Sequence, residues 1–504
     1  MKLEELIEGI SYLDSRGPLN SLIRGLACDS REVRGGYMFV AVRGHENDGH
    51  DFIDSAIKRG ASAIVFDSRL PLYNFPDTVT LIQVPDSREA LSDLAVRFYD
   101  KPYEGMELVG ITGTNGKTTT SYILESIIRA AGAQPGIIGT INYRYQGKSR
   151  PAQVTTPGPL ELMRMLREMK DGGVTHVVME VSSHALEQGR VSRCPFKVAL
   201  FTNFSRDHLD YHGSMESYFE AKSLLFQSLN NHYNHEIRWA VLNRDDERSE
   251  DLERITVAPV LTYGFGRGSH LRAREVELSK EGIRAYLETP EGALKVSSSL
   301  IGKFNVYNIM AAFAGARCLE IDDETIIQGI ADLKSVPGRL EKVENSRSLS
   351  IIVDYAHTPD ALMKAIDAIQ PIRKGRLITL FGCGGDRDQG KRGPMGRVAA
   401  TYSDLTIITS DNPRREDPLE IVRQVEQGVL EAGGRRLESS PGKTVAKGSY
   451  ILEVDREKAI EKAVRIAEKD DLVLIAGKGH EDYQIRGAEK RHFDDREIAR
   501  AFAS

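Results

Sequence analysis

The amino-acid sequence predicts an α/β protein with three domains. The chain has 504 residues, which is more than one hydrophobic core usually serves. Short apolar runs alternate with helical periodicity along its length, and this alternation is typical of α/β folds with parallel sheets. The pattern restarts at a Gly-rich loop after Leu108 and again from about Val336. We therefore predict domains at 1–104, 105–335 and 336–504.

The composition is that of a globular protein, and its charge excludes some classes of partner. Hydrophobic residues make up 40% of the sequence and charged residues 28%, unlike a disordered chain. Lys and Arg total 67 against 73 Asp and Glu, which gives a net charge of -6. No overall basic field therefore attracts nucleic acid, and small anionic ligands need local basic sites.

Cysteine usage and the N-terminus indicate a cytoplasmic protein. The N-terminal segment MKLEELIEGI is acidic and amphipathic, unlike a signal peptide, and no apolar run approaches the roughly 20 residues of a membrane span. The cysteines are far apart and form no CxxC pair, so they fit reduced thiols better than a disulfide framework or a zinc site. They are Cys28, Cys194, Cys318 and Cys383.

The first domain reads as a small α/β unit ahead of the Gly-rich loop. Its predicted strands are 37–42, 61–66 and 80–84, and its predicted helices are 50–60 and 87–100. The segments 28–44 and 45–52 place several hydrogen-bonding groups beside predicted strand ends. They are either ordinary polar loops or a site for a ligand with a nucleotide or sugar head.

The segment LVGITGTNGKTTT at 108–120 predicts a strand, a phosphate-binding loop and a helix N-terminus in that order. Gly113 and Gly116 would let backbone N–H groups close on phosphate oxygens, Lys117 would reach the β and γ phosphates, and the Thr118 hydroxyl would bind Mg²⁺. The strict motif has a glycine where this chain has Ile111, so an ordinary Gly-rich turn is the alternative. The favoured ligand is a nucleoside triphosphate.

Two further predicted strands of the central domain end in polar groups. Glu180 lies near the end of the apolar run 176–181, where a buried carboxylate would need a cation. Past the strand 198–203 come Asp207, His208, Asp210 and His212, which could bind zinc but, without cysteine and near a phosphate loop, fit Mg²⁺ and phosphate better. His208 is the choice if one of them is a ligand. Lys222, on a predicted helix, is by composition alone a surface lysine.

Four of these motifs, GTNGKTTT, EVSSHALEQGR, TNFSRDHLDYHG and YFEAK, together resemble the Mur ligases. These ATP-dependent enzymes form the amide bonds of the peptide stem of bacterial peptidoglycan, and the resemblance covers essentially the whole chain. Further stretches resemble the members that add the third amino acid. The resemblance implies a UDP-sugar-binding first domain, a central P-loop ATPase domain with a parallel sheet and a Rossmann-like C-terminal domain that binds an amino acid.

The resemblance also implies a chemistry and a set of residues. ATP would phosphorylate a substrate carboxylate, and an amine would then attack the acyl phosphate, which demands positioning and charge neutralisation. Thr118, Glu180, His208 and Lys222 would hold Mg²⁺, with Lys222 carbamylated, and Lys117, Lys222 and His208 would be catalytic. The implied ATP-binding residues are Gly113, Thr114, Asn115, Gly116, Lys117, Thr118, Thr119, Asn308 and Arg339.

The same resemblance implies where a UDP-linked substrate binds. Ser30, His45, Glu46 and Asn47 would contact the uridine nucleotide in the first domain. Arg190 suits a carboxylate or a diphosphate because a guanidinium binds either through paired hydrogen bonds. The residues at the muramoyl-peptide end would be Thr155, Thr156, Ser182, Gln188 and Arg190.

The last domain repeats an apolar strand followed by a Gly-rich or polar loop, in the segments 348–366, 376–396, 404–418 and 471–484. The run GCGGDRD at 382–388 lacks the spacing of a dinucleotide fingerprint, so we reject an NAD site. DNPR at 411–414 resembles enzymes that take meso-diaminopimelate, whose second carboxylate Arg414 could bind, whereas the ε-ammonium of lysine would be repelled. The implied diaminopimelate-binding residues are Arg387, Asp411, Asn412, Pro413, Arg414, Gly477 and Glu481.

The expected protein is therefore a monomeric, Mg²⁺-dependent ligase of ATP, UDP-N-acetylmuramoyl-L-alanyl-D-glutamate and meso-diaminopimelate. Three alternatives stay open. L-Lysine could replace diaminopimelate, the chain could be a folylpolyglutamate synthetase with the same acyl-phosphate chemistry, or it could be a P-loop switch ATPase. The last two have no use for an Arg-bearing pocket in the third domain.

Overall fold

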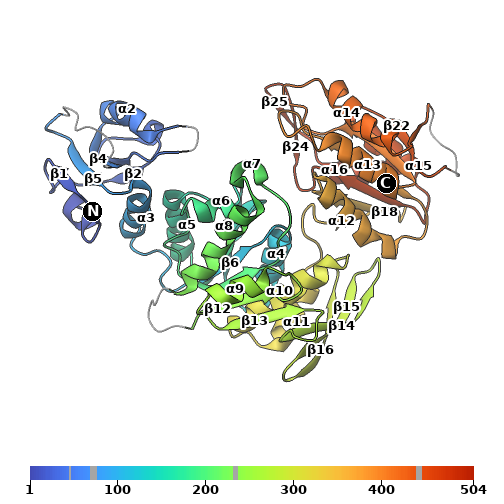
Figure 1. Cartoon of the computed structure of the whole chain (residues 1–504), viewed down its shortest axis with the longest axis horizontal. Coiled ribbons are helices and arrows are strands. Elements are labelled where there is room, and N and C mark those ends of the chain that lie inside the picture. The colour runs from blue at the N-terminus through green and yellow to red at the C-terminus, as the bar shows by residue number, and fades with distance from the viewer. Residues whose placement is uncertain (45–46, 68–75, 231–236, 439–444) are drawn as a thin grey trace. The chain divides into compact units, whose positions relative to one another are not determined.

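The computed structural model describes residues 1–44, 47–67, 76–230, 237–438 and 445–504 (Figure 1). It divides into two compact units, which are described separately. The first comprises Met1–Arg272 with Met310–Gly329, and the second comprises Ala273–Ile309 with Ile330–Ser504. The domain boundaries predicted after residues 104 and 335 stay a prediction.

The first unit begins with a five-stranded sheet in the order β1-β5-β4-β3-β2, parallel except for β1. Successive residues of β3 face opposite sides, so Met38 joins one buried cluster and Phe39 the other. All three predicted strands are confirmed, and the predicted helix 50–60 starts as a 3-10 turn. The elements are α1 (Leu3–Ile7), β1 (Asp14–Arg16), β2 (Gly25–Ala27), η1 (Ser30–Glu32), β3 (Tyr37–Val40), η2 (Gly49–Phe52), α2 (Ile53–Lys58), β4 (Ala61–Asp67), β5 (Thr80–Val84) and α3 (Ser87–Phe98).

The second sheet of this unit carries the Gly-rich loop on a central strand. Within the unit its order is β13-β12-β11-β6-β10-β7-β8-β9, parallel from β13 to β7 and antiparallel from there to β9. β6 lies between β11 and β10, so the carboxyl ends of all three strands meet at one edge. These strands and their neighbours are β6 (Glu107–Thr112), β7 (Pro135–Ile138), β8 (Asn142–Tyr145), β9 (Lys148–Pro151), β10 (His176–Glu180), β11 (Phe196–Phe201), β12 (Trp239–Asn243) and β13 (Val260–Gly264).

The helix N-terminus predicted after the loop and the helix predicted around Lys222 are present as α4 and α8. α4 begins at Lys117, so the Lys-Thr residues of the loop already form its first turn. The helices are α4 (Lys117–Ala130), α5 (Pro159–Asp171), α6 (Ser183–Glu187), α7 (Leu209–His212), α8 (Met215–Gln227), η3 (Ser228–Asn230) and α9 (Ser249–Ile255). β14 (Leu271–Leu278), α10 (Phe304–Cys318) and α11 (Asp323–Asp332) each cross the division between the units.

The second unit is built on a seven-stranded sheet in the order β17-β18-β23-β19-β20-β22-β21, parallel except for β17. Every residue of β19, β20 and β23 is buried, as strands covered on both faces require. The strands are β15 (Ile283–Thr289), β16 (Gly292–Ser298), β17 (Glu341–Lys342), β18 (Ser350–Asp354), β19 (Leu377–Cys383), β20 (Leu405–Ser410), β21 (Arg435–Arg436), β22 (Ser449–Leu452), β23 (Leu472–Ala476), β24 (Tyr483–Arg486) and β25 (Glu489–His492).

Helices cover this sheet, and α13 packs along α14 (Figure 1). The helices are α12 (Pro359–Ile369), η4 (Gln370–Ile372), α13 (Arg392–Tyr402), α14 (Pro418–Glu431), α15 (Arg456–Ile466) and α16 (Asp495–Phe502). The predicted α/β class is confirmed in both units. Among the described residues, no helix combines the length and the apolar character needed to cross a membrane.

Candidate functional site

The Gly-rich loop is held to the segment after β11 by backbone and side-chain hydrogen bonds. The Thr114 amide donates to the Asn203 carbonyl at 2.8 Å, and the Thr202 hydroxyl donates to the Asn115 carbonyl at 2.6 Å. Gly113 has φ +137°, and a Cβ there would lie 2.0 Å from the Thr202 hydroxyl oxygen. Only glycine fits this close approach, so the loop conformation depends on it.

The loop leads directly into the N-terminus of α4, which suits an anion. Gly116 is left-handed at φ 89°, and the helix begins at Lys117 with no side-chain cap for its first N–H groups. The Lys117 ammonium donates to the carbonyls of Gly113 at 2.8 Å and Thr114 at 3.0 Å. A lysine placed over the loop in this way can move to a bound phosphate without a change in the backbone.

Thr118 and Glu180 meet at the carboxyl ends of β6 and β10. The Thr118 hydroxyl donates to Glu180 Oε2 at 2.9 Å, and the carboxylate also accepts the Thr140 hydroxyl at 2.9 Å and the Thr140 amide at 3.0 Å. Glu180 is 1% exposed. A Cβ at Gly139 would lie 2.3 Å from Glu180 Oε1, so this neighbour must be small. The predicted buried carboxylate therefore exists, and hydroxyl and amide groups fix its direction.

Lys222 is buried, so the composition-based expectation of a surface lysine is wrong. It is 1% exposed because the apolar Phe219, Leu225 and Phe226 share its face of α8. Its Nζ donates to the Gly113 carbonyl at 3.0 Å and lies 4.5 Å from the ring centre of Tyr218. Burial, and next the charge of Lys117, lowers the pKa of Lys222 well below its usual value. Because Lys117 shares the Gly113 carbonyl, a neutral amine fits this position better than a second cation.

His208 is the accessible member of a group of aromatic rings beside the loop. Its side chain is 48% exposed, whereas His212 is 1% exposed and contacts Ser183 at 2.9 Å and Glu187 at 3.1 Å. This difference supports the preference for His208 as a ligand. Burial, with the charges of nearby lysines, lowers the pKa of His208 despite the adjacent Asp207. A neutral imidazole, which metal binding requires, is thus favoured. His184 and Tyr218 pack edge-on against the His208 ring.

The residues predicted for the muramoyl-peptide end form one hydrogen-bonded network. Arg190 donates to the Thr156 carbonyl at 2.8 Å and to Gln188 Oε1 at 2.7 Å, and the Ser182 amide donates to the Thr156 hydroxyl at 3.1 Å. Thr155 lies 3.1 Å from the Thr140 hydroxyl, which itself bonds Glu180. The network therefore touches the Thr118–Glu180 pair. In the first sheet, Ser30 is buried and Asn47 is exposed, while His45 and Glu46 lie outside the described residues.

A magnesium ion would find oxygen ligands beside the loop. The Thr118 hydroxyl and the Glu180 carboxylate are the hard oxygen groups that Mg²⁺ prefers. In the part of the chain that the structure describes, no group of three or more His, Cys, Asp or Glu side chains could hold a metal ion. A magnesium site here would therefore need hydroxyl, phosphate or modified-lysine oxygens as well.

In the second unit, a cluster of polar side chains follows the carboxyl ends of β20 and β23. Asn412 donates to Glu481 Oε2 at 2.8 Å and accepts the Ile485 amide at 3.0 Å. Gly477 has φ +113°, and a Cβ there would lie 2.8 Å from Asp411 Oδ2. Burial, offset in part by Lys478, raises the pKa of Glu481. The predicted residues Asp411, Asn412, Gly477 and Glu481 are thus brought together.

The two predicted arginines near this cluster differ in how firmly hydrogen bonds hold them. Arg414, half-buried at φ 51°, donates to the Gly385 carbonyl at 2.9 Å, and its amide donates to the Ile485 carbonyl at 3.1 Å. Its loop packs tightly, since a Cβ on Gly385 would lie 1.9 Å from the Pro413 carbonyl oxygen. Arg387 is exposed, and its guanidinium donates to the Asp386 carbonyl at 3.4 Å. Arg414 is therefore preorganised, whereas Arg387 is exposed and weakly held.

Two predicted ATP-binding residues belong to this second unit. Asn308, on α10, is buried and donates to Asn305 at 2.8 Å. The Arg339 guanidinium lies 4.9 Å from the ring centre of Tyr355. Their role beside the nucleotide stays a prediction.

Sequence reasoning missed three residues that these sites use. Thr140 orients Glu180, and Tyr218 reaches Thr114 at 3.3 Å as well as Lys222. Lys478, 0% exposed, lies 3.3 Å from Glu481 and 3.4 Å from Asn412. The spacing of Tyr218 and Lys222 at i and i+4 on one helix face could have indicated their contact. No sequence pattern near Lys478 or Thr140 predicts that either residue contacts the site.

Comparison with known proteins adds family matches along most of the chain. The family model described as "Mur ligase family, catalytic domain" matches residues 22–99. The "Mur ligase middle domain" matches residues 111–316, and the "Mur ligase, glutamate ligase domain" matches residues 338–479. The matches follow one another in the order of the three sheets.

Curated relatives and solved structures match over nearly the full length. The UDP-N-acetylmuramoyl-L-alanyl-D-glutamate--2,6-diaminopimelate ligase of Geobacter sulfurreducens is 47% identical over 99% of this chain and 98% of its own. The protein of the same name from Geobacillus thermodenitrificans is 44% identical over 99% of both chains. A solved structure of that name has 30% identity and a TM-score of 0.72, covering 100% of this chain and 98% of its own.

Proposed function

The chain belongs to the Mur ligase family, and we propose that it joins meso-2,6-diaminopimelate to the D-glutamate of UDP-N-acetylmuramoyl-L-alanyl-D-glutamate. It is an ATP-dependent amide-forming ligase, and the proposed product is a peptidoglycan precursor made in the cytoplasm. The observation that carries the proposal is the full-length identity of 47% to a relative with this activity in its name. The pocket around Arg414 supports the choice of amino acid.

In the first proposed step, an oxygen of the D-glutamate carboxylate attacks the γ-phosphorus of ATP. The bond from that phosphorus to the β,γ-bridging oxygen breaks, ADP leaves, and an acyl phosphate remains. The loop amides and the start of α4 would hold the phosphates. Lys117 would leave the carbonyls of Gly113 and Thr114 and neutralise charge on the transferring group.

Magnesium would supply a positive charge that clamps the phosphate oxygens during this step. Thr118 and Glu180 would hold it, together with His208 and a carbamate on Lys222. The Thr118–Glu180 contact of 2.9 Å supports the first half of this set. The exposed, neutral imidazole of His208 supports the third member.

Carbamylation of Lys222 is supported by its environment. The lowered pKa favours the neutral amine, whose lone pair can attack CO₂ to form a carbamate with release of one proton. The product carries a negative charge where the ammonium would have carried a positive one. It therefore removes the repulsion from Lys117 and adds an anionic oxygen near the loop.

In the second proposed step, the neutral amine of diaminopimelate attacks the acyl carbon, the bond to the phosphate oxygen breaks, inorganic phosphate leaves, and the amine nitrogen gives up one proton to solvent. Glu481 would bind an ammonium group of the amino acid, and Arg414 its distal carboxylate. The lysine side chain has no such carboxylate, so binding it would leave Arg414 facing another cation. The preorganised loop of Arg414 supports this selectivity.

The test is ADP release from the purified chain with ATP, Mg²⁺ and the UDP-linked dipeptide. We expect release to depend on meso-diaminopimelate and to be at least tenfold slower with L-lysine at the same concentration. Equal rates would replace the acceptor assignment with the lysine alternative. Release that needs no amino acid would favour a switch ATPase, and release that needs folate would favour a folylpolyglutamate synthetase.

A further inference from the structure

A fully buried ion pair lies behind the proposed amino-acid pocket. Arg456 is the first residue of α15 and Asp495 the first residue of α16. The guanidinium donates to both carboxylate oxygens, from Nε to Oδ1 at 2.8 Å and from Nη2 to Oδ2 at 2.6 Å. Both side chains are 0% exposed.

The remaining donors of Arg456 reach the ends of two strands that are not neighbours. Nη2 donates to the Ala476 carbonyl at 3.0 Å, and Nη1 to the Ser410 carbonyl at 3.4 Å. Ala476 ends β23 and Ser410 ends β20, and β19 lies between these strands in the sheet. One guanidinium therefore ties together two strand ends across a third strand.

The residues immediately after these two carbonyls belong to the proposed pocket. Gly477 follows Ala476, and Asp411 follows Ser410. The two are in close contact, because a Cβ on Gly477 would lie 2.8 Å from Asp411 Oδ2. A shift of either strand end would change this contact and the direction of the Asp411 carboxylate.

The position of Arg456 is unfavourable for stability alone. A cation in the first turn of a helix opposes the helix dipole, and a buried ion pair often stabilises no more than apolar side chains of similar size. Burial lowers the pKa of Arg456, but Asp495, with smaller contributions from Asp411 and Glu481, raises it overall. The guanidinium is thus charged and electrostatically coupled to the pocket carboxylates.

We propose that Arg456, held by Asp495, is a positioning residue that sets the relative placement of Asp411 and Gly477 and thereby the affinity for the incoming amino acid. The inference rests on the proposed function, since it assigns a role within the same acceptor site. Arg456 touches no substrate in this account. Its effect passes through the two carbonyls.

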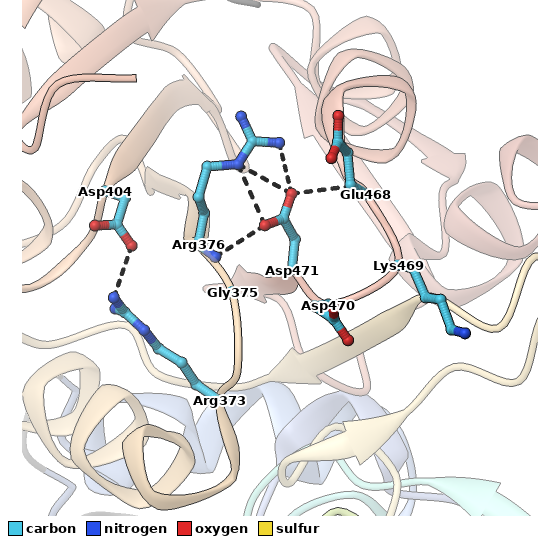
Figure 2. Close-up of a pocket in the computed structure, with 8 residues that line it drawn as sticks. All are labelled: Arg373, Gly375, Arg376, Asp404, Glu468, Lys469, Asp470 and Asp471. Carbon is cyan, nitrogen blue, oxygen red and sulfur yellow. Dashed lines mark hydrogen bonds and ion pairs between the residues drawn. The ribbon is translucent and has the colours of Figure 1, made fainter. Parts of the chain in front are cut away.

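A second Arg–Asp pair, at the amino ends of strands in the same sheet, provides a matched control. Arg376 precedes β19 and Asp471 precedes β23, and the guanidinium again chelates the carboxylate, with Nη2 to Oδ2 at 2.6 Å (Figure 2). Figure 2 shows this pair beside the Arg373–Asp404 pair. Both pairs line a cavity of about 390 Å³. Arg376 also donates to the Ile466 carbonyl at 3.0 Å, and the pair is 16% and 5% exposed. It lies at the amino ends of the strands, away from the pocket residues.

The experiment compares Arg456→Lys and Asp495→Asn with Arg376→Lys and Asp471→Asn in the full chain. KM is measured separately for meso-diaminopimelate, ATP and the UDP-linked dipeptide, with kcat and the thermal midpoint. We expect Arg456→Lys and Asp495→Asn to raise KM for diaminopimelate at least tenfold while the other two KM values stay within twofold. The Arg376 and Asp471 variants should lose similar stability and keep all three KM values.

Four other results would contradict the positioning role or the proposed function on which it rests. An unchanged diaminopimelate KM in a folded Arg456→Lys protein removes the positioning role, and so does an equal rise in Arg376→Lys. If both variants of the Arg456 pair fail to fold while the controls fold, the pair is a structural element and the assignment is wrong. If the parent protein shows no diaminopimelate-dependent ADP release, the proposed function fails first and takes this inference with it.

Discussion

The phosphate loop and the amino-acid pocket both lie at carboxyl ends of parallel strands, but they are assembled in different ways. The loop is one continuous segment, 113–118, whose backbone is tied mainly to the segment 202–205, and the side chains of Glu180, Tyr218 and Lys222 contact it as well. The pocket joins the segments 384–387, 411–414 and 477–485, mostly through side-chain hydrogen bonds. A local motif can therefore be recognised from sequence, whereas the pocket exists only after the sheet has formed.

The two sites also differ in the partners of their buried lysines. Beside the loop, Lys117 and Lys222 share one carbonyl, whereas in the pocket Lys478 lies against Glu481. The first arrangement is costly until an anion arrives, because Lys222 is either repelled by Lys117 as an ammonium or must give up its proton. The second is balanced before substrate binds. Substitutions in the two regions should consequently have separable effects on stability and on each substrate.

The largest expected effect is that of Lys222→Met, which should change activity and stability in opposite directions. Activity should fall by about 1000-fold or more, because removing a group that stabilises the transition state typically costs this much. Stability should rise. The folded-state pKa of Lys222 lies below its unfolded value, so at pH 7 the unfolded chain binds more protons and the amine disfavours folding.

The measurement is the thermal midpoint of parent and variant in bicarbonate-free buffer, together with ADP release. The advantage of Lys222→Met should be present at pH 7 and shrink as the pH rises toward 10, where the unfolded lysine also loses its proton. The exposed Lys280→Met serves as control and should change neither property. A Lys222→Met protein less stable than the parent at pH 7 would contradict the conclusion that the Lys222 amine disfavours folding.

The second prediction concerns Arg414→Ala in the pocket. Loss of a charge-assisted contact to the substrate carboxylate should lower kcat/KM for meso-diaminopimelate roughly 100-fold, or about 2.7 kcal/mol. KM for ATP should stay within twofold, since the loop is untouched. The neighbouring exposed Arg415→Ala is the matched control and should behave like the parent. Equal kinetics for Arg414→Ala and the parent would refute the carboxylate contact.

A smaller effect, a roughly tenfold rise in KM for diaminopimelate at pH 7, is expected for Lys478→Met. Burial already raises the pKa of Glu481, and Lys478 opposes that rise. Without the lysine, more of the carboxyl is protonated and its attraction for the substrate ammonium is lost. The acid limb of kcat/KM against pH should therefore move to higher pH, and activity should recover as pH increases. Lys469→Met, nine residues earlier and exposed, should leave that limb in place.

Much of the fold could be predicted from sequence because its strands are short apolar runs between turns. The antiparallel strands β8 and β9 and the hairpin β15–β16 were not predicted, since their alternating polar residues give little contrast with loops. The loop residues were located individually because their order in the chain is also their order in space.

The side chains that support the sites were harder to predict. Lys478 lies in a run, GKGHED, that reads as an exposed loop, yet the fold buries it against Asn412. Arg456 reads as an ordinary first-turn residue, and its partner Asp495 comes 39 residues later. Lys222 could have been assigned to a buried face from the spacing of Phe219 and Phe226, which composition alone ignores.

The central claim is that the loop makes the acyl phosphate and the pocket only selects the amine. It is tested most directly by trapping the intermediate as a hydroxamate, with hydroxylamine in place of the amino acid, in the parent, Lys222→Met and Arg414→Ala proteins. The account predicts that Arg414→Ala forms hydroxamate from ATP and the UDP-linked dipeptide at the parent rate and that Lys222→Met forms almost none. Loss of trapping in Arg414→Ala, or parent-level trapping in Lys222→Met, would contradict it.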